Sequence, residues 1–250
     1  IRTARGLVRL ADAKGQVRAV GTASASNPLA VRIFRFEEAP LDEAFFRERL
    51  ESALVLRDLW GLEGPSAGCR WVFGEGDGMP GLVVDRYAEA LVLQVGTAGL
   101  EALRPVWWPI LETLGRQRGV SAFVERSSSG RKEEGLTPSN RILKGSLAGP
   151  VTVEEGPARL RVDLFKGQKT GFFLDQREHR LALGRLSRGA RVLNAFGYTG
   201  GFSIHAGLGG AEEVATLDVS APALKSSWRL RASTCPTTIR PQPRSRSSRF

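Results

Sequence analysis

One segment in the last quarter of the 250-residue chain constrains the fold more than any other. It reads VLNAFGYTGGF over residues 192–202, and VATLD follows at residues 214–218. These residues predict a buried strand, a glycine-rich turn, a helix start and a second strand that ends in a carboxylate. Open α/β sheets place these elements in this order where they hold a nucleoside-bearing cofactor, at the carboxyl ends of their strands. The segment therefore predicts an α/β fold with a cofactor site.

The glycines of this turn favour one kind of cofactor. Gly197, Gly200 and Gly201 allow a ligand to approach the backbone and allow positive φ angles. They do not form the G-x-G-x-x-G pattern that holds the pyrophosphate of a nicotinamide dinucleotide. A cofactor without phosphates, such as S-adenosylmethionine, fits this looser turn, and Asp218 is placed to accept both ribose hydroxyls. The alternative is a doubly wound sheet in which the turn binds nothing.

Upstream, the hydrophobic pattern predicts short strands, helices and one long loop. Asp42 is expected to cap a helix that stops at Gly61, and residues 125–144 read as an exposed loop or linker. The glycine-dense loop at residues 74–81 should join two strands, and its two carboxylates argue against a phosphate site. The other expected strands are residues 7–10, 17–20, 30–34, 70–73, 82–85, 91–95, 122–125, 151–153 and 160–164, and the other helices 100–118, 176–186 and 202–207.

Composition narrows the class of protein. An apolar content of 42% predicts a packed core, and no apolar run is long enough to span a membrane. Cys69 and Cys235 support neither a disulfide framework nor a metal site, which favours the cytoplasm. The net charge of +10 comes mostly from residues 225–250, which hold seven basic and no acidic residues. This Ser-, Pro- and Arg-rich tail is expected to be disordered.

Three stretches together resemble a known family. They are KGQKTGFFLDQR at residues 166–177, NAFGYTGGFSIHA at residues 194–206 and GLVVDRY at residues 81–87. The chain resembles the PUA-domain-containing class I S-adenosylmethionine-dependent 23S rRNA (cytosine-C5) methyltransferases over about residues 4–224. The resemblance implies four parts: a partial PUA-like β module (1–36), a linking helix with a central α+β domain (37–148), the N-terminal half of a Rossmann-like methyltransferase domain (149–224) and the tail (225–250).

The resemblance also implies a function and a cofactor site. It implies methyl transfer from S-adenosylmethionine to a cytosine of 23S rRNA, an RNA partner and no membrane partner, and it leaves a homodimer open. It places residues 173–177 beside the cofactor. Together with the turn, the expected cofactor-binding residues are Phe173, Asp175, Gln176, Arg177, Asn194, Phe196, Tyr198, Thr199, Gly200, Gly201, Phe202 and Asp218.

No catalytic residue is expected in this chain. In the family, a cysteine thiolate adds to C6 of the cytosine, and an Asp-Pro-Pro-type motif lines the substrate pocket. Neither is present, since Cys69 reads as a buried hydrophobe and Cys235 stands in the tail. The change of composition near Lys225 is typical of a frameshift or a mispredicted gene end. We therefore expect a catalytically incompetent methyltransferase fragment; the alternative is a non-enzymatic RNA-binding protein that uses the PUA-like piece and the basic tail.

Several other candidates have simpler explanations. His205 is expected to pack rather than catalyse, because no carboxylate partner is evident. His179 reads as solvated, and Asp175 could act only as a helix N-cap. Trp107 and Trp108 fall on a predicted helix and should belong to its core-facing side.

Overall fold

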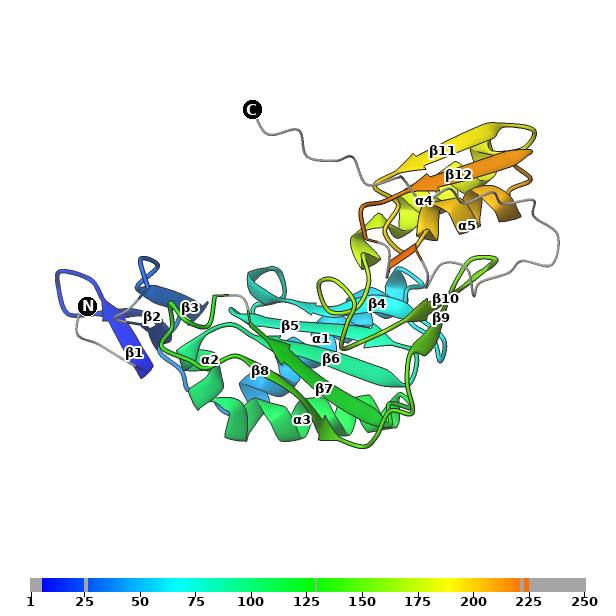
Figure 1. Cartoon of the computed structure of the whole chain (residues 1–250). Helices are drawn as coiled ribbons and strands as arrows, with labels where there is room; N and C mark the ends of the chain where they lie inside the picture. The colour runs from blue at the N-terminus through cyan, green and yellow to red at the C-terminus, as the bar shows by residue number, and fades with distance from the viewer. Residues whose placement is uncertain (1–5, 25–26, 129, 221–222, 225–250) are drawn as a thin grey trace, which may run out of the picture. The chain divides into compact units, whose positions relative to one another are not determined.

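The chain divides into two compact units in the computed structural model, which describes residues 6–24, 27–128, 130–220 and 223–224. The first unit comprises residues 1–151 and 162–172, and the second comprises residues 152–161 and 173–250 (Figure 1). The predicted tail, with Cys235, lies outside the described residues.

The first unit begins with a three-stranded antiparallel sheet. Its strands are β1 (Gly6–Ala11), β2 (Val17–Ala23) and β3 (Val31–Arg35), in that order. All three strands expected here are confirmed. Val20 and Phe34 are buried and join the larger core of the unit, so this small sheet does not depend on its own surface alone.

The core of the first unit is a five-stranded sheet with helices packed on one face. The strands run in the order β4 (Gly68–Phe73), β5 (Leu82–Tyr87), β6 (Ala90–Val95), β7 (Ala122–Ser127) and β8 (Ser139–Lys144). Only β6 and β7 pair in parallel, and the crossover between them carries α2 (Ala98–Ala102) and α3 (Arg104–Gln117). Phe46 and Leu50 of α1 (Glu43–Leu59) and Trp107 of α3 pack with the apolar side chains of the sheet. The second face of the sheet is therefore free of these helices.

The helices follow the expected signals with one break. The Asp42 side chain accepts the N–H of Phe45 at 3.0 Å and caps α1, and Gly61 follows the helix with φ +62°. Trp107 is fully buried and Trp108 packs beside the core, as expected. The single helix expected over residues 100–118 is instead two helices that meet at Leu103. Pro105 explains the break, because proline lacks an N–H and disfavours helical backbone just before it.

The expectation of one long loop over residues 125–144 is wrong in part. Residues up to Ser127 complete β7, and Ser139–Lys144 form β8, which pairs antiparallel with β7. The polar composition misled the prediction because β8 is the last strand of its sheet and most of its side chains are exposed. Edge strands carry polar and charged residues that discourage further strand pairing.

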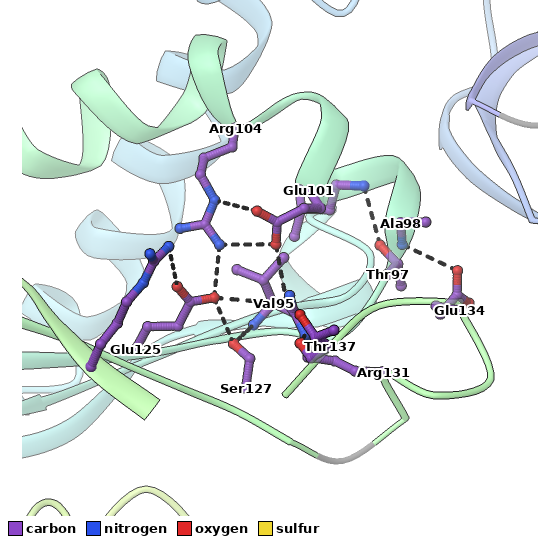
Figure 2. Close-up of polar contacts among 12 residues, drawn as sticks. Val95, Thr97, Ala98, Glu101, Arg104, Glu125, Ser127, Arg131, Glu134 and Thr137 are labelled. Carbon is purple, nitrogen blue, oxygen red and sulfur yellow. Dashed lines mark hydrogen bonds and ion pairs between the residues drawn. The ribbon is translucent and has the colours of Figure 1, made fainter. Parts of the chain in front are cut away.

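Buried charges hold the segment between β7 and β8 in place (Figure 2). Glu125 is fully buried and receives a 2.8 Å hydrogen bond from Arg104. Arg131, also buried, donates to the Val95 carbonyl at 2.8 Å and contacts Glu101 at 3.1 Å. Since burying an unpaired charge is costly, this pairing fixes the segment against the end of β6.

The same segment is joined to the N-terminal sheet. Glu134 accepts hydrogen bonds from Arg32 at 2.9 Å, from Asn27 at 2.8 Å and from the N–H of Ala98 at 3.1 Å. The Arg32–Glu134 ion pair is largely shielded from solvent. One buried carboxylate thus connects β3, the start of α2 and the segment after β7.

The second unit contains a hairpin and a small parallel sheet with two helices. The hairpin is β9 (Val151–Glu155) and β10 (Ala158–Val162), whose outer ends belong to the first unit. The rest is the short 3₁₀ helix η2 (Leu174–Gln176), α4 (Arg177–Leu186), β11 (Arg191–Ala195), α5 (Gly201–Leu208) and β12 (Glu213–Leu217). Strands β11 and β12 pair in parallel with Asn194 opposite Thr216, and α4 and α5 pack closely enough that a Cβ on Gly209 would clash with the Gly184 carbonyl.

The first predicted strand of this unit is less buried than expected. Val192 packs with the core formed by Ala206, Ala211 and Val214, but Leu193 is 64% exposed. Residues of β11 alternate between the two faces of the sheet, and the described helices cover only one of them. The expectation of a buried strand is therefore met on only one face in the described part of the chain.

Candidate cofactor site

The turn after β11 has a backbone that ordinary residues seldom adopt. Phe196 and Tyr198 have φ angles of +59° and +48°, and Gly200, which precedes α5, has φ +79°. Non-glycine residues with positive φ carry strain and often mark functional sites. A Cβ on Gly197 would lie 2.4 Å from Thr216 Cγ2, so glycine is needed there for close approach. The N–H of Gly197 also donates to the Leu217 carbonyl at 2.9 Å, which ties the turn to the end of β12.

Asp218 lies directly after β12 and accepts a hydrogen bond from the turn. Its Oδ2 accepts the N–H of Tyr198 at 2.8 Å, and its Oδ1 accepts the N–H of Ser220 at 2.7 Å. The side chain is half-buried. A carboxylate oxygen has two acceptor positions, so each oxygen keeps one for a ligand hydroxyl. Asp218 is therefore held in place by the backbone and still able to accept two hydrogen bonds.

Asn194 has a structural partner. Its Nδ2 donates to Ser203 Oγ at 2.8 Å, and Ser203 Oγ lies 2.6 Å from Thr216 Oγ1. This chain of polar groups joins the ends of both strands to the first turn of α5. It fixes the strand ends from which the turn and Asp218 extend.

The aromatic residues at positions 173 and 198 meet. The rings of Phe173 and Tyr198 have centroids 5.6 Å apart and planes at 82°, the edge-to-face arrangement that aromatic pairs prefer. This contact places the start of the 173–177 segment at the turn. Asp175 is exposed and does not cap α4, because η2 extends the helical segment and Gln176 is the residue before α4.

The structure describes every expected cofactor-binding residue, but only some of them contact one another. Phe173, Tyr198 and Asp218 are linked by the contacts above, and the backbone of residues 197–201 forms the turn between them. Phe196 is 88% exposed and makes no ring contact in the described part of the chain. Thr199, Arg177 and Phe202 are half-buried. The groups with the best-defined positions are therefore Asp218, Tyr198 and Phe173.

The stretches that carry the resemblance meet in the first unit as well. Thr170 Oγ1 donates to Asp85 Oδ2 at 2.5 Å, and the N–H of Phe172 donates to the Tyr87 hydroxyl at 3.1 Å. All four side chains are buried. Thr170 and Phe172 of the 166–177 stretch thus pack on β5, and residues 173–177 belong to the second unit.

Sequence reasoning missed a buried cluster behind Phe173. Arg180 donates to both Glu155 oxygens, at 2.5 Å and 2.6 Å, and to the Phe173 carbonyl at 2.9 Å. His205 Nε2 lies 3.0 Å from Glu155 Oε1. Burial disfavours ionised Glu155, but the hydrogen bonds from Arg180 and the adjacent His205 outweigh it and lower the pKa of Glu155 to about 2.

One signal could have revealed this cluster. Val151, Val153 and Glu155 alternate along one face of β9, and all three are buried. Because the expected strand ended at residue 153, Glu155 lay outside it, and no carboxylate partner was evident for His205. His205 is buried, in line with a packing role, but the expectation that it has no carboxylate partner is wrong. His179 is exposed as expected.

Other features of the described residues narrow the chemistry. They hold no group of three metal-binding side chains, and none of their helices is both long and apolar enough to cross a membrane. Cys69 is a free, buried thiol, as expected. Burial and the nearby charge of Glu63 raise the pKa of Cys69, so it is a poor nucleophile.

Comparison with known proteins identifies the family that part of the chain resembles. The family model described as S-adenosylmethionine-dependent methyltransferase matches residues 141–231, which include the turn and Asp218. This part of the chain is similar to that methyltransferase family. The chain is similar to ribosomal RNA large subunit methyltransferase I of Shewanella denitrificans, with 40% identity over 83% of this chain and 52% of the relative. A ribosomal RNA large subunit methyltransferase of Deinococcus radiodurans is 40% identical over 87% of this chain and 55% of the relative.

Solved structures support the fold of the methyltransferase family over most of the chain. A Streptococcus mutans protein described as a SAM-dependent methyltransferase matches 92% of this chain and 59% of its own, with a TM-score of 0.78 and 20% identity. A second structure, described as a methyltransferase complexed with SAH, matches 92% of this chain and 58% of its own with a TM-score of 0.79 and 20% identity. The chain has a mixed α/β fold and spans about half the length of the curated relatives that it matches.

Proposed function

We propose that this chain is the cofactor-binding part of an S-adenosylmethionine-dependent methyltransferase that acts on cytosine C5 of 23S rRNA. The observation that supports the cofactor assignment is the hydrogen bond from the Tyr198 N–H, in the turn after β11, to Asp218. A carboxylate after the second strand, held beside a glycine turn after the first, suits a ribose with two free hydroxyls. The names of the relatives support the rRNA substrate.

The residues present fit this cofactor. Each oxygen of Asp218 has one acceptor position left for a ribose hydroxyl. The turn offers backbone without a side chain at Gly200, where a ligand can come close. Phe173 and Tyr198 provide an apolar wall beside the turn. When bound, S-adenosylmethionine supplies a methyl group on a sulfonium.

The parts expected from the sequence are retained in the proposal. Residues 1–36 are proposed as a partial PUA-like module, residues 37–148 as a central domain, and residues 149–224 as the first half of a Rossmann-like domain. The three-stranded sheet and the parallel pair β11–β12 with its helices support the first and last of these. A cytoplasmic location also stays a prediction.

No catalytic nucleophile is proposed in the described residues. Cytosine-C5 methylation in this family uses a cysteine thiolate, and the buried Cys69 has a raised pKa. We therefore keep the prediction that the chain alone does not turn over. Incorporation of tritium-labelled methyl groups from S-adenosylmethionine into unmodified 23S rRNA measures this turnover. Clear incorporation would contradict the prediction.

Calorimetric titration tests the cofactor site directly. S-adenosylmethionine and S-adenosylhomocysteine should both bind to the wild-type chain with one site. Asp218→Ala should weaken both, because both ligands carry the same ribose. If neither ligand binds at millimolar concentration to a folded chain, the proposed cofactor site is wrong.

A further inference from the structure

A second concave site lies in the first unit, at one end of the five-stranded sheet. Its volume is about 170 Å³, and it opens where β4, β6 and β7 end and β5 begins. The lining includes Phe73, Glu75, Val83, Gln94, Ser127 and Ser128. None of these residues belongs to the cofactor site.

One side of this pocket is flat and apolar. Phe73 pairs with Val83 in the sheet, and Val83 pairs with Gln94, so the three side chains share one face. This is the face that the helices of the unit leave uncovered. Phe73 is 58% exposed, and the Arg70 guanidinium lies 5.4 Å from its ring centroid. Exposed aromatic side chains on a sheet are groups on which unpaired RNA bases stack.

The same face also offers unused hydrogen-bonding groups. Gln94 donates one bond, from Nε2 to the Arg126 carbonyl at 3.3 Å. Its Oε1 and second N–H have no other partner among the described residues. Ser128 is exposed at the rim. An amide presents a donor and an acceptor side by side, which matches the edge of a nucleobase.

Charge decides which part of a nucleotide fits. Glu75 lines the pocket, and its carboxylate would repel a phosphate. The small volume excludes a long ligand. A neutral, planar ring that stacks on Phe73 and is bonded at its edge meets both conditions.

The pocket wall is held rigidly. Ser127 Oγ accepts the N–H of Val95 at 2.8 Å and donates to Glu125 at 3.0 Å, as Figure 2 shows. Glu125 is the buried carboxylate that Arg104 also binds. A wall fixed in advance loses little entropy when a ligand binds.

We propose that this pocket receives one unpaired base of the RNA substrate, stacked against Phe73 and bonded by Gln94. The proposal rests on the proposed function, since it takes RNA as the substrate. It adds a base-binding site in the first unit, separate from the cofactor turn.

Fluorescence anisotropy with short labelled single-stranded RNAs (oligo-C, oligo-U and oligo-A) tests the proposal on the full chain. Phe73→Ala should weaken binding at least about fivefold, the lower range for loss of one base–aromatic stack. Phe73→Tyr should bind like the wild type, and Gln94→Leu should reduce the preference among the three RNAs. Trp60→Ala is the matched control, because Trp60 is 73% exposed at the end of α1 and does not line the pocket.

Each result has a clear meaning. If the wild type binds RNA and the Phe73 and Gln94 variants bind equally well, the pocket proposal is overturned and the proposed function stands. If the wild type binds no RNA, both the pocket and the RNA substrate are overturned, while the calorimetric test still decides the cofactor site. If Phe73→Ala does not fold by circular dichroism, the comparison of Phe73→Tyr with Phe73→Leu decides, since only tyrosine should retain binding.

Discussion

The N–H of Tyr198 donates a 2.8 Å hydrogen bond to Asp218, a residue twenty positions further along the chain. This bond joins the turn after β11 to the residue that ends β12. The carboxylate therefore helps to hold the turn in which Tyr198 has a positive φ. Asp218 holds the turn, and each of its carboxylate oxygens keeps one acceptor position.

Replacement of Asp218 should remove cofactor binding. Asp218→Ala loses the proposed ribose contacts, and hydrogen bonds to a charged group contribute about 1.5–3 kcal/mol each. The dissociation constant for S-adenosylmethionine should rise at least about tenfold, measured by calorimetry. Glu212→Gln is the control, because Glu212 is an exposed carboxylate of the same unit. Equal affinities for the two variants would show that Asp218 does not bind the ribose.

Arg180 should matter to stability as well as to the site. Arg180→Met leaves the buried Glu155 with only His205 beside it and frees the Phe173 carbonyl. Removing one partner of a buried ion pair costs about 3–5 kcal/mol. Hydrogen exchange of the α4 and α5 amides in a urea series measures the unfolding free energy of the second unit separately from that of the first. Arg188→Met is the control, since Arg188 is exposed, and the same loss in both variants would contradict the assigned role.

Acid should weaken the second unit through Glu155. Its pKa of about 2 in the folded chain lies below the ordinary value of 4.5, so the folded state favours the ionised form. The resulting stabilisation is complete above pH 4.5 and is lost as the pH falls toward 2. The free energy involved is on the order of 3 kcal/mol. Hydrogen exchange of the α4 and α5 amides, measured from pH 6 to pH 2, should show this loss of stability. Glu155→Gln should remove that part of the pH dependence of stability.

A methyl group at position 197 should strain the turn. In Gly197→Ala the new Cβ would lie 2.4 Å from Thr216 Cγ2 and 2.8 Å from Asn194 Nδ2. Overpacking of this kind costs about 1–3 kcal/mol. Gly64→Ala is the control, because a Cβ there meets nothing within 4 Å. Thermal unfolding of the two variants compares them, and equal midpoints would mean that the turn relaxes without cost.

Cys69 should resist alkylation in the folded chain. The thiol is buried, its pKa is raised, and it lies 3.4 Å from Glu63. In a Cys235→Ser background, iodoacetamide at pH 8 should label Cys69 only after urea is added. Mass spectrometry follows the label, and rapid modification without urea would show that the first unit opens readily.

Much of the fold could be predicted from local patterns. The cap at Asp42 and the 3.6-residue spacing located α1, and the glycines after residue 194 located the turn into α5. These features depend on neighbours a few positions apart, so the sequence displays them directly. The break at Leu103 was also readable from Pro105 and was overlooked.

Other features depend on partners far apart in the chain. Ser139–Lys144 is a strand because β7 lies beside it, and its own composition resembles a loop. Glu155 is buried because Arg180 and His205 come from two later helices to meet it. Period-two alternation in β9 indicated that Glu155 points inward, but no local rule names its partners. The positive φ angles of Phe196 and Tyr198 likewise follow from tertiary contacts.

The route of the chain limits how the protein can be dissected. Thr152–Arg161 leaves the first unit to supply Glu155, the chain returns for residues 162–172, and Phe173 then begins the remainder of the second unit. No single cleavage point separates the two units. A cut before residue 152 leaves residues 162–172 of the first unit on the C-terminal fragment, and a cut after residue 172 leaves residues 152–161 of the second unit on the N-terminal fragment. A fragment that starts at Phe173 would keep Arg180 and lose its carboxylate. Limited proteolysis should therefore yield fragments that stay associated. Halves expressed separately should fold poorly, because the hairpin residues of the second unit remain with the first half.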